Sequence, residues 1–240
     1  MRADEPVSDE GMGGDILERQ PLHWLLLAFL VGFALLLRTE TMLVGSFWGL
    51  SSNTWFWLSI ASAVVHQVYV WFVWRVELDR RLVTRLIGRR WGFGLYALDF
   101  SLLLMARFLT IVGLAIANAG TLPWPPPVVY LLAVVLAVPF VYLQYSVLRY
   151  FGIRRAMGLD HFEPALRNEP LVREGIFAYI PNAMYAVGFL GLYLPGLLLF
   201  SQAALLAAAF QHAYIWVHYY CTELPDMRHI YGVHELRERY

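Results

Sequence analysis

Long apolar runs are the feature that most restricts the fold of this chain. A helix needs about 20 mostly apolar residues to cross the hydrocarbon core of a bilayer. Four runs approach or exceed that length, and a fifth is long enough to cross twice: residues 22–37, 54–74, 95–117, 128–148 and 176–220. Within the fifth run, Leu194-Pro195-Gly196 predicts a hairpin turn, because proline and glycine interrupt helices. The sequence therefore predicts an all-α polytopic integral membrane protein with about six transmembrane helices and a C-terminal helical hairpin.

The arginines lie in alternate connections between these runs. They gather after the second run, after the fourth and in the C-terminal tail: Arg75, Arg80, Arg81, Arg85, Arg89, Arg90; Arg149, Arg154, Arg155, Arg167, Arg173; Arg228, Arg237, Arg239. The other connections contain Arg38 alone or no arginine. Loops rich in arginine stay on the cytoplasmic side of a membrane. The pattern therefore predicts a multi-pass protein with cytoplasmic N- and C-termini.

The composition supports a membrane protein and excludes several other classes. Charged residues make up 15% of the chain, whereas soluble domains contain about 25%. The formal net charge is zero, which gives no reason to expect a nucleic-acid partner. The single cysteine, Cys221, excludes an internal disulfide and a multi-cysteine metal site. Residues 1–20 are acidic and are expected to form a disordered tail. Residues 21–240 are expected to form one membrane domain, with four spans in 21–150 and a loop, hairpin and tail in 151–240.

Polar side chains in the hairpin mark the region where chemistry is expected. Polar groups in a bilayer are costly and usually indicate function or burial against protein. Pro181 disturbs the start of the fifth span, which would leave backbone carbonyls and the Asn182 side chain available to a ligand. In the sixth span, two neighbouring stripes follow helical spacing: Gln211, Tyr214, His218 and Thr222, with His212, Tyr219 and Glu223 beside them. Both stripes are predicted to face other helices or a wet cavity.

Two short boxes lie on either side of the hairpin. Their matching residues are Gly175, Phe177, Asn182 and Tyr185 in the first, and Glu223, Pro225 and Tyr231 in the second. In this order they resemble the membrane methyltransferases that include isoprenylcysteine carboxyl methyltransferase and the phosphatidylethanolamine (phospholipid) N-methyltransferases. The residue Asn182, where the family also has histidine, favours the phospholipid branch. The chain departs from the family at Pro181, Ala183 and Leu224, which replace Arg, Pro and a second Glu.

The resemblance implies an S-adenosylmethionine-dependent methyltransferase acting on a membrane lipid, preferably on the amine of phosphatidylethanolamine. It implies a cofactor site at the cytoplasmic end of the hairpin, formed by Tyr179, Asn182, Tyr185, Glu223, Arg228, His229 and Tyr231. Glu223 would pair with the ammonium group of the cofactor, and Arg228 or His229 would meet its carboxylate. The tyrosines would pack on its adenine or sulfonium. The base that removes a proton from the amine would be His218 or Glu223.

Two other functions fit parts of the same pattern. A membrane reductase of the sterol-reductase type would use NADPH and a similar C-terminal hairpin, with Arg228 and His229 near the 2′-phosphate. A transporter or accessory subunit would line a path with Arg107, His66 and His218, and it would bind neither cofactor. Cofactor binding to the purified protein separates these possibilities.

Purely structural roles are open for the same side chains. His218 is also typical of hydrogen bonding between helices, Asn182 of a helix cap, and Glu223 of an ion pair with Arg228. Arg107 lies deep in the third predicted span, where a charged group must be paired or hydrated. Its partner cannot be identified from the sequence.

Overall fold

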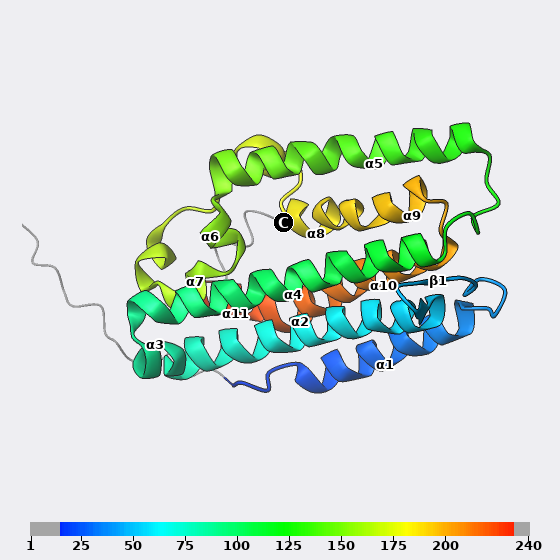
Figure 1. Cartoon of the computed structure of the whole chain (residues 1–240). Helices are drawn as coiled ribbons and strands as arrows, with labels where there is room; N and C mark the ends of the chain where they lie inside the picture. Colours follow the sequence, from blue (N-terminus) through cyan, green and yellow to red (C-terminus); the bar gives the residue numbers. More distant parts are fainter. Residues whose placement is uncertain (1–14, 233–240) are drawn as a thin grey trace, which may run out of the picture.

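Four long helices run side by side and build most of the fold (Figure 1). The computed structural model describes residues 15–232, excluding the side chains of residues 167 and 168. In this range, four helices are long and apolar enough to cross a membrane: α1 (Gln20–Leu37), α2 (Ser52–Arg80), α4 (Arg89–Ala117) and α5 (Pro126–Ser146), which continues as η1 (Val147–Phe151). In length and composition they match the first four predicted spans and support an integral membrane protein. The six-span count and the cytoplasmic termini stay predictions.

Short elements close both ends of this bundle. At one end an antiparallel ribbon, β1 (Ser46–Phe47) and β2 (Leu50–Ser51), joins α1 to α2. The opposite end carries α3 (Leu82–Ile87), α6 (Ile153–Ala156), α7 (Leu159–Phe162) and the 3₁₀ turn η2 (Pro164–Asn168). We call this the arginine-rich end, because the arginines of the α2–α4 and α5–α8 connections lie there.

The C-terminal hairpin is less regular than predicted. Its first arm consists of η3 (Gly175–Ala178), α8 (Ala183–Ala186), η4 (Gly188–Tyr193) and α9 (Leu194–Leu198). Its second arm is α10 (Gln202–His218), which continues through η5 (Tyr219–Glu223) into α11 (Leu224–Tyr231). The turn lies at residues 199–201, where Phe200 has a φ angle of 53°. The predicted turn at Leu194-Pro195-Gly196 was wrong because Pro195 occupies the first turn of α9, where its missing N–H is tolerated.

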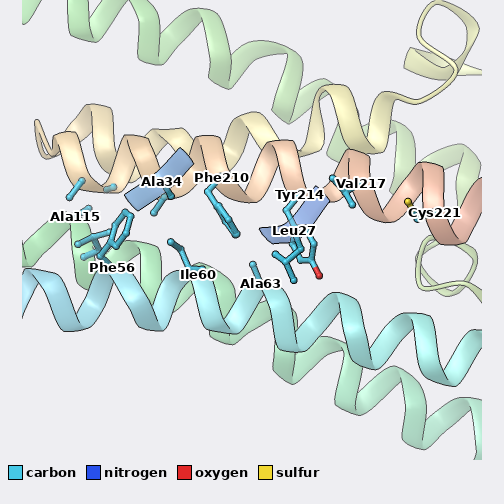
Figure 2. Packing of buried hydrophobic residues seen from close by; sticks show 14 residues of the cluster. Leu27, Ala34, Phe56, Ile60, Ala63, Ala115, Phe210, Tyr214, Val217 and Cys221 are labelled. Atoms are coloured by element: carbon cyan, nitrogen blue, oxygen red, sulfur yellow. The ribbon is translucent and has the colours of Figure 1, made fainter. Parts of the chain in front are cut away.

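The central helix is α10, which packs against α1, α2 and α4. Its small residues Ala203, Ala204 and Ala207 are fully buried and allow neighbouring helices to approach closely. Farther along, Phe210 points toward Ile60 of α2 in the same apolar cluster (Figure 2). The first predicted polar stripe of this helix is buried as well: Gln211, Tyr214, His218 and Thr222. These residues confirm that the stripe faces other helices.

The structure describes the last six residues of the segment 1–20, for which a disordered tail is expected. Residues 15–20 form a turn and the start of α1, and they contact the rest of the fold. The amide Nε2 of Gln20, for example, lies 3.4 Å from Oγ1 of Thr222. Residues 15–20 are therefore ordered by partners that lie far away in the sequence. Residues 1–14 and 233–240, which include Arg237 and Arg239, lie outside the described residues.

Candidate active site at the arginine-rich end

Two helices adopt π geometry at the arginine-rich end. In η1 the Gly152 N–H donates to the Val147 carbonyl, and in η5 the Leu224 N–H donates to the Tyr219 carbonyl. A π turn widens the helix by one residue and releases carbonyl groups from the regular hydrogen-bond ladder. Such turns are frequent at functional sites. Here they give α5 and α10 an irregular end where other side chains can reach the backbone.

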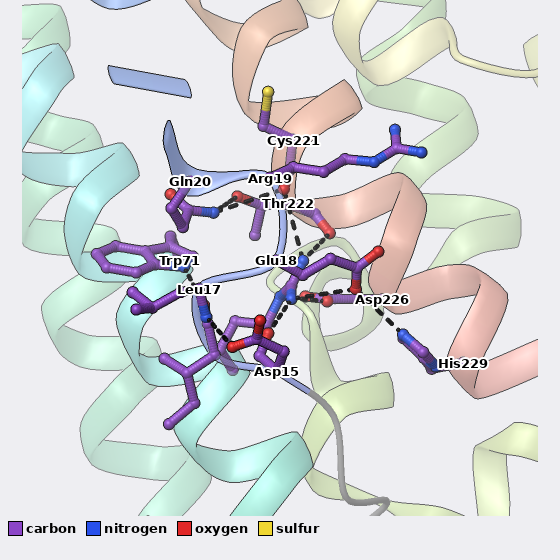
Figure 3. Close-up of polar contacts among 12 residues, drawn as sticks. Asp15, Leu17, Glu18, Arg19, Gln20, Trp71, Cys221, Thr222, Asp226 and His229 are labelled. Atoms are coloured by element: carbon purple, nitrogen blue, oxygen red, sulfur yellow. Dashed lines mark hydrogen bonds and ion pairs between the residues drawn. The ribbon is translucent and has the colours of Figure 1, made fainter. Parts of the chain in front are cut away.

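The released carbonyls of η5 are held by side chains from the N-terminal half of the chain (Figure 3). Arg19 donates from Nη1 to the Tyr220 carbonyl at 3.1 Å. Arg75 of α2 places Nη2 at 3.5 Å from the Cys221 carbonyl and 3.4 Å from the Thr222 carbonyl. The conformation of η5 therefore depends on residues that are distant in sequence.

Arg75 is also the centre of an ion network that joins four parts of the chain. Its Nε lies 2.5 Å from Oδ1 of Asp226, and Oδ2 of Asp226 lies 3.3 Å from Nε2 of His161. Glu18 lies 3.5 Å from Nη1 of Arg75 and 3.2 Å from Nε2 of His229 (Figure 3). Arg75 and Asp226 are buried, whereas Glu18 and His229 are partly exposed. This network fixes α11 and the segment before α1 against α2 and α7.

A cleft lies beside η5. Its aromatic lining comes from α2, η1, η3, α8 and η5: Trp74, Phe151, Phe177, Tyr185 and Tyr219. Its ionisable lining consists of Arg155, Asp160 and Glu223, and Asn182 adds an amide. Both π turns contribute, through Phe151 and through Tyr219 with Glu223. The other lining residues are aliphatic side chains and Gly158, so the cleft is mainly apolar, with two carboxylates and one guanidinium among its polar groups.

On the side of the cleft that carries Arg155 and Asp160, these two residues and Tyr231 contact one another. Nε of Arg155 lies 3.2 Å from Oδ2 of Asp160, and this oxygen accepts a 2.6 Å hydrogen bond from the Tyr231 hydroxyl. Nη2 of Arg155 donates to the same hydroxyl at 2.9 Å. Burial lowers the pKa of Arg155, but Asp160 and Tyr231 outweigh burial, so the pKa is raised. Burial, and then Asp160, raise the pKa of Tyr231, which keeps the phenol protonated at neutral pH.

Three of the predicted site residues line the cleft. Asn182, Tyr185 and Glu223 come together there from the two arms of the hairpin. Tyr185 packs against Tyr219 with 5.3 Å between ring centroids. Tyr231 lies behind the wall and orients Arg155 and Asp160 rather than facing the cleft itself.

The other predicted site residues lie elsewhere. Tyr179 is 80% exposed, Arg228 is exposed, and His229 contacts Glu18. None of these three residues lines the cleft. In the sequence these three residues lie within the two family boxes. In the fold, the turns at η3 and α11 place them away from the cleft.

His218, the other candidate base, is buried inside the helix bundle. Its ring lies 5.8 Å from the Trp74 ring and 6.4 Å from the His23 ring, measured between centroids. Neither ring nitrogen has a hydrogen-bond partner among the described residues. His218 does not line the cleft, so the geometry favours Glu223 over His218 as a group that meets a substrate.

Sequence reasoning missed several residues of the cleft. Trp74 was interpreted only as the end of the second span, and Arg155 only as a topological signal. Asp160 was not considered, because one carboxylate in a polar loop has no distinguishing pattern. The glycine at position 158 is a sequence signal for close packing in this loop, and in the structure Gly158 has a φ angle of 87°. A Cβ atom there would lie 2.4 Å from the Trp74 ring.

Residues 128–234 match the sequence profile of phospholipid methyltransferases. This part, a little under half of the chain, is similar to that family. Among curated relatives, phosphatidylethanolamine N-methyltransferases of Scheffersomyces stipitis and Candida tropicalis are 37% and 39% identical over 75 residues. The enzyme of Clavispora lusitaniae is 33% identical over 73 residues. Each match covers 30% of this chain and 8% of the relative. No solved structure matches the chain.

These matches confirm the resemblance carried by the two boxes. The phospholipid methyltransferase segment begins in α5 and ends after α11, so it includes both π turns and most of the cleft lining. Trp74 and Arg75 lie outside this segment, on α2. Trp74 of α2 therefore completes a cleft whose other lining residues belong to the matched segment.

Proposed function

We propose that this protein is an S-adenosylmethionine-dependent methyltransferase of membrane lipids, with the amine of phosphatidylethanolamine as its preferred acceptor. The observation that carries the proposal is the cleft formed by Asn182, Tyr185 and Glu223 in the family segment. These residues come from both family boxes. The cleft lies at the ends of apolar helices, where a lipid headgroup and a water-soluble cofactor can meet. If the termini are cytoplasmic, as predicted, the reaction takes place at the inner leaflet.

The residues present fit a cationic methyl donor. S-adenosylmethionine supplies a methyl group on a positively charged sulfonium. The cleft offers aromatic rings and the carboxylates of Asp160 and Glu223, which attract positive charge. Asn182 can donate to or accept from the polar amino-acid part of the cofactor. Tyr185 and Tyr219 would bind its apolar surfaces.

The protein would contribute positioning, charge and proton removal. An amine must lose a proton to become a nucleophile, and the Glu223 carboxylate is the candidate base because it lines the cleft. The aromatic walls would exclude water and hold the amine in line with the methyl group. The π turn η5 fixes Glu223, and the contacts of Arg75 and Arg19 stabilise that turn.

The cleft gives less support to an NADPH reductase. A 2′-phosphate needs available cationic donors. The arginine in the cleft lining, Arg155, already contacts Asp160 and Tyr231. Arg228 and His229, which were considered for this role, do not line the cleft.

The test is to measure S-adenosylmethionine binding and lipid methylation by the purified protein in nanodiscs containing phosphatidylethanolamine. Glu223→Gln removes the charge and keeps the side-chain shape. We expect it to reduce methylation at least about a hundredfold, the scale of losing a general base. Glu40→Gln, an exposed carboxylate on the connection between α1 and β1, is the matched control and should retain wild-type activity. Methylation by Glu223→Gln at the wild-type rate would remove this residue from the reaction. Absence of both binding and methylation in wild-type protein would reject the function.

A further inference from the structure

We propose that residues 15–20, which we call the strap, are a positioning element for the proposed reaction. The strap holds the π turn η5 through the side chains of Arg19 and Gln20. This turn begins at Tyr219 and ends at Glu223, and both residues line the cleft. The proposal rests on the proposed function, because it names residues that act on the same site from outside the segment that matches the family.

The sequence around η5 creates a need for donors from elsewhere in the fold. Pro225 has no backbone N–H, so it cannot donate to the carbonyl four residues back, at Cys221, or five residues back, at Tyr220. These are the carbonyls that its N–H would reach in an α turn and in a π turn, respectively. A backbone carbonyl without its helical donor needs another partner when it is kept from water. The proline therefore leaves the backbone of η5 dependent on outside donors.

The strap supplies a donor to each of these two carbonyls (Figure 3). Nη1 of Arg19 donates to the Tyr220 carbonyl at 3.1 Å. Nε2 of Gln20 lies 3.5 Å from the Cys221 carbonyl and 3.4 Å from Oγ1 of Thr222. A hydrogen bond from a charged donor is stronger than one from a neutral amide. We therefore expect Arg19 to contribute more than Gln20.

The strap is itself fixed to α2. Nε1 of Trp71 donates to the Ile16 carbonyl at 3.1 Å, and Nη1 of Arg75 donates to the Asp15 carbonyl at 2.8 Å. Arg19 has a φ angle of 59°, a left-handed conformation that residues other than glycine rarely adopt. Such a conformation persists only where the surrounding contacts determine it. The contacts of the strap therefore place Arg19, rather than its own backbone preference.

The two carbonyls lie between the cleft residues of η5, so their contacts bear on the geometry of the cleft. Tyr219, at the start of the turn, packs against Tyr185 with 5.3 Å between ring centroids. A change from π to α geometry would rotate Glu223 relative to Tyr219 by roughly a quarter of a turn. A displacement of about 1 Å from the productive position can cost about a hundredfold in rate. The strap would preserve the rate by keeping η5 in its π geometry.

The test follows methyl transfer and backbone hydrogen exchange in the full-length protein in phosphatidylethanolamine nanodiscs. Arg19→Met removes the donor and keeps a side chain of similar shape near the backbone. We expect kcat to fall about fivefold, the scale of one hydrogen bond from an exposed charged donor. Exchange of the amides in residues 219–224 should become faster. Arg19→Lys keeps a charged donor and should regain most of the rate and of the protection from exchange.

Two further variants separate the side-chain contact from other effects. Arg38→Met is the matched control, because Arg38 lies at the other end of α1 and donates to Asn53 at 2.8 Å. It should leave kcat and the exchange of η5 at wild-type values. Arg19→Gly removes the side chain but favours the positive φ angle, so it should behave like Arg19→Met. Gln20→Met should change kcat in the same direction, and the Arg19 variants decide the test if this buried substitution prevents folding.

The positioning role is overturned if Arg19→Met or Arg19→Gly keeps the wild-type kcat, or if Arg38→Met lowers kcat equally. Faster exchange in η5 with an unchanged kcat would also overturn it, because the strap would then hold the turn without affecting the reaction. Absence of methylation by the wild type would reject the proposed function and the positioning role together. Methylation that does not depend on Arg19 would reject the positioning role alone.

Discussion

Two buried arginines contact the same C-terminal arm in different ways. Arg107 of α4 donates from Nε to the Gln211 side chain at 2.9 Å and places Nη1 at 3.4 Å from Nδ1 of His66. Its guanidinium also lies 5.1 Å from the Phe189 ring. No carboxylate forms an ion pair with Arg107 within residues 15–232. Arg75, in contrast, contacts Asp226, Glu18 and the carbonyls of η5.

The difference follows the depth of the two residues in the helix bundle. Arg107 lies well inside α4, where the cost of burying a second charge is high and neutral partners are used. Arg75 lies near the arginine-rich end, where carboxylates from α11 and the N-terminal segment reach it. Arg107 therefore contacts side chains that hold helices together. Arg75 also holds the backbone of η5, which carries a residue of the cleft.

The largest effect in this comparison should come from Asp226→Ala. The substitution leaves Arg75 buried without its closest carboxylate, and breaking a buried ion pair in this way costs about 3–5 kcal/mol. We expect a loss of that size in the free energy of unfolding, measured by titration with a denaturing detergent. Asp79→Asn, which affects a pair with the exposed Arg80, should change stability little. A loss below about 1 kcal/mol in Asp226→Ala would show that Arg75 is adequately held by carbonyl groups.

A smaller effect is expected for Arg107→Met. The apolar side chain replaces a buried charge, but the Gln211 oxygen loses its donor, which costs about 1–3 kcal/mol. Binding of S-adenosylmethionine should stay at the wild-type level, because Arg107 does not line the cleft. Arg75→Met should weaken that binding, because Arg75 holds the backbone of η5. The two variants therefore distinguish the role of Arg75 from that of Arg107. Equal loss of S-adenosylmethionine binding in both variants would contradict the distinction between a packing role for Arg107 and a role of Arg75 at the cleft. A transport activity that is lost in the Arg107 variant would also contradict it.

The smallest effect should come from the exposed part of the Arg75 network. Glu18 and His229 contact each other at 3.2 Å, but both side chains are more than one-third exposed. Exposed ion pairs contribute about 0–1 kcal/mol and weaken with salt. We therefore expect His229→Ala to leave thermal stability and methylation nearly unchanged at 0.3–0.5 M salt. A loss comparable to that of Asp226→Ala would show that the pair holds α11 in place.

The sequence predicted the parts of the fold that depend on local properties. Apolar length located α1, α2, α4 and α5 to within a few residues, apart from the extension of α2 to Arg80 and the earlier start of α4 at Arg89. Helical spacing identified the buried stripe of α10, because residues three or four positions apart share one face. The family boxes also identified Asn182, Tyr185 and Glu223, which line the cleft together.

Only the tertiary structure decided how the site is assembled and where the hairpin turns. Arg75 and Thr222, for example, are separated by 147 positions in the sequence and meet at a released carbonyl. Trp74 and Asp160 enter the cleft because distant segments pack there, and neither belongs to a local motif. Apolar length and helical period are properties of one segment, so the sequence determines them directly. A contact between segments depends on the packing of all their neighbours, so it is decided only when the chain has folded.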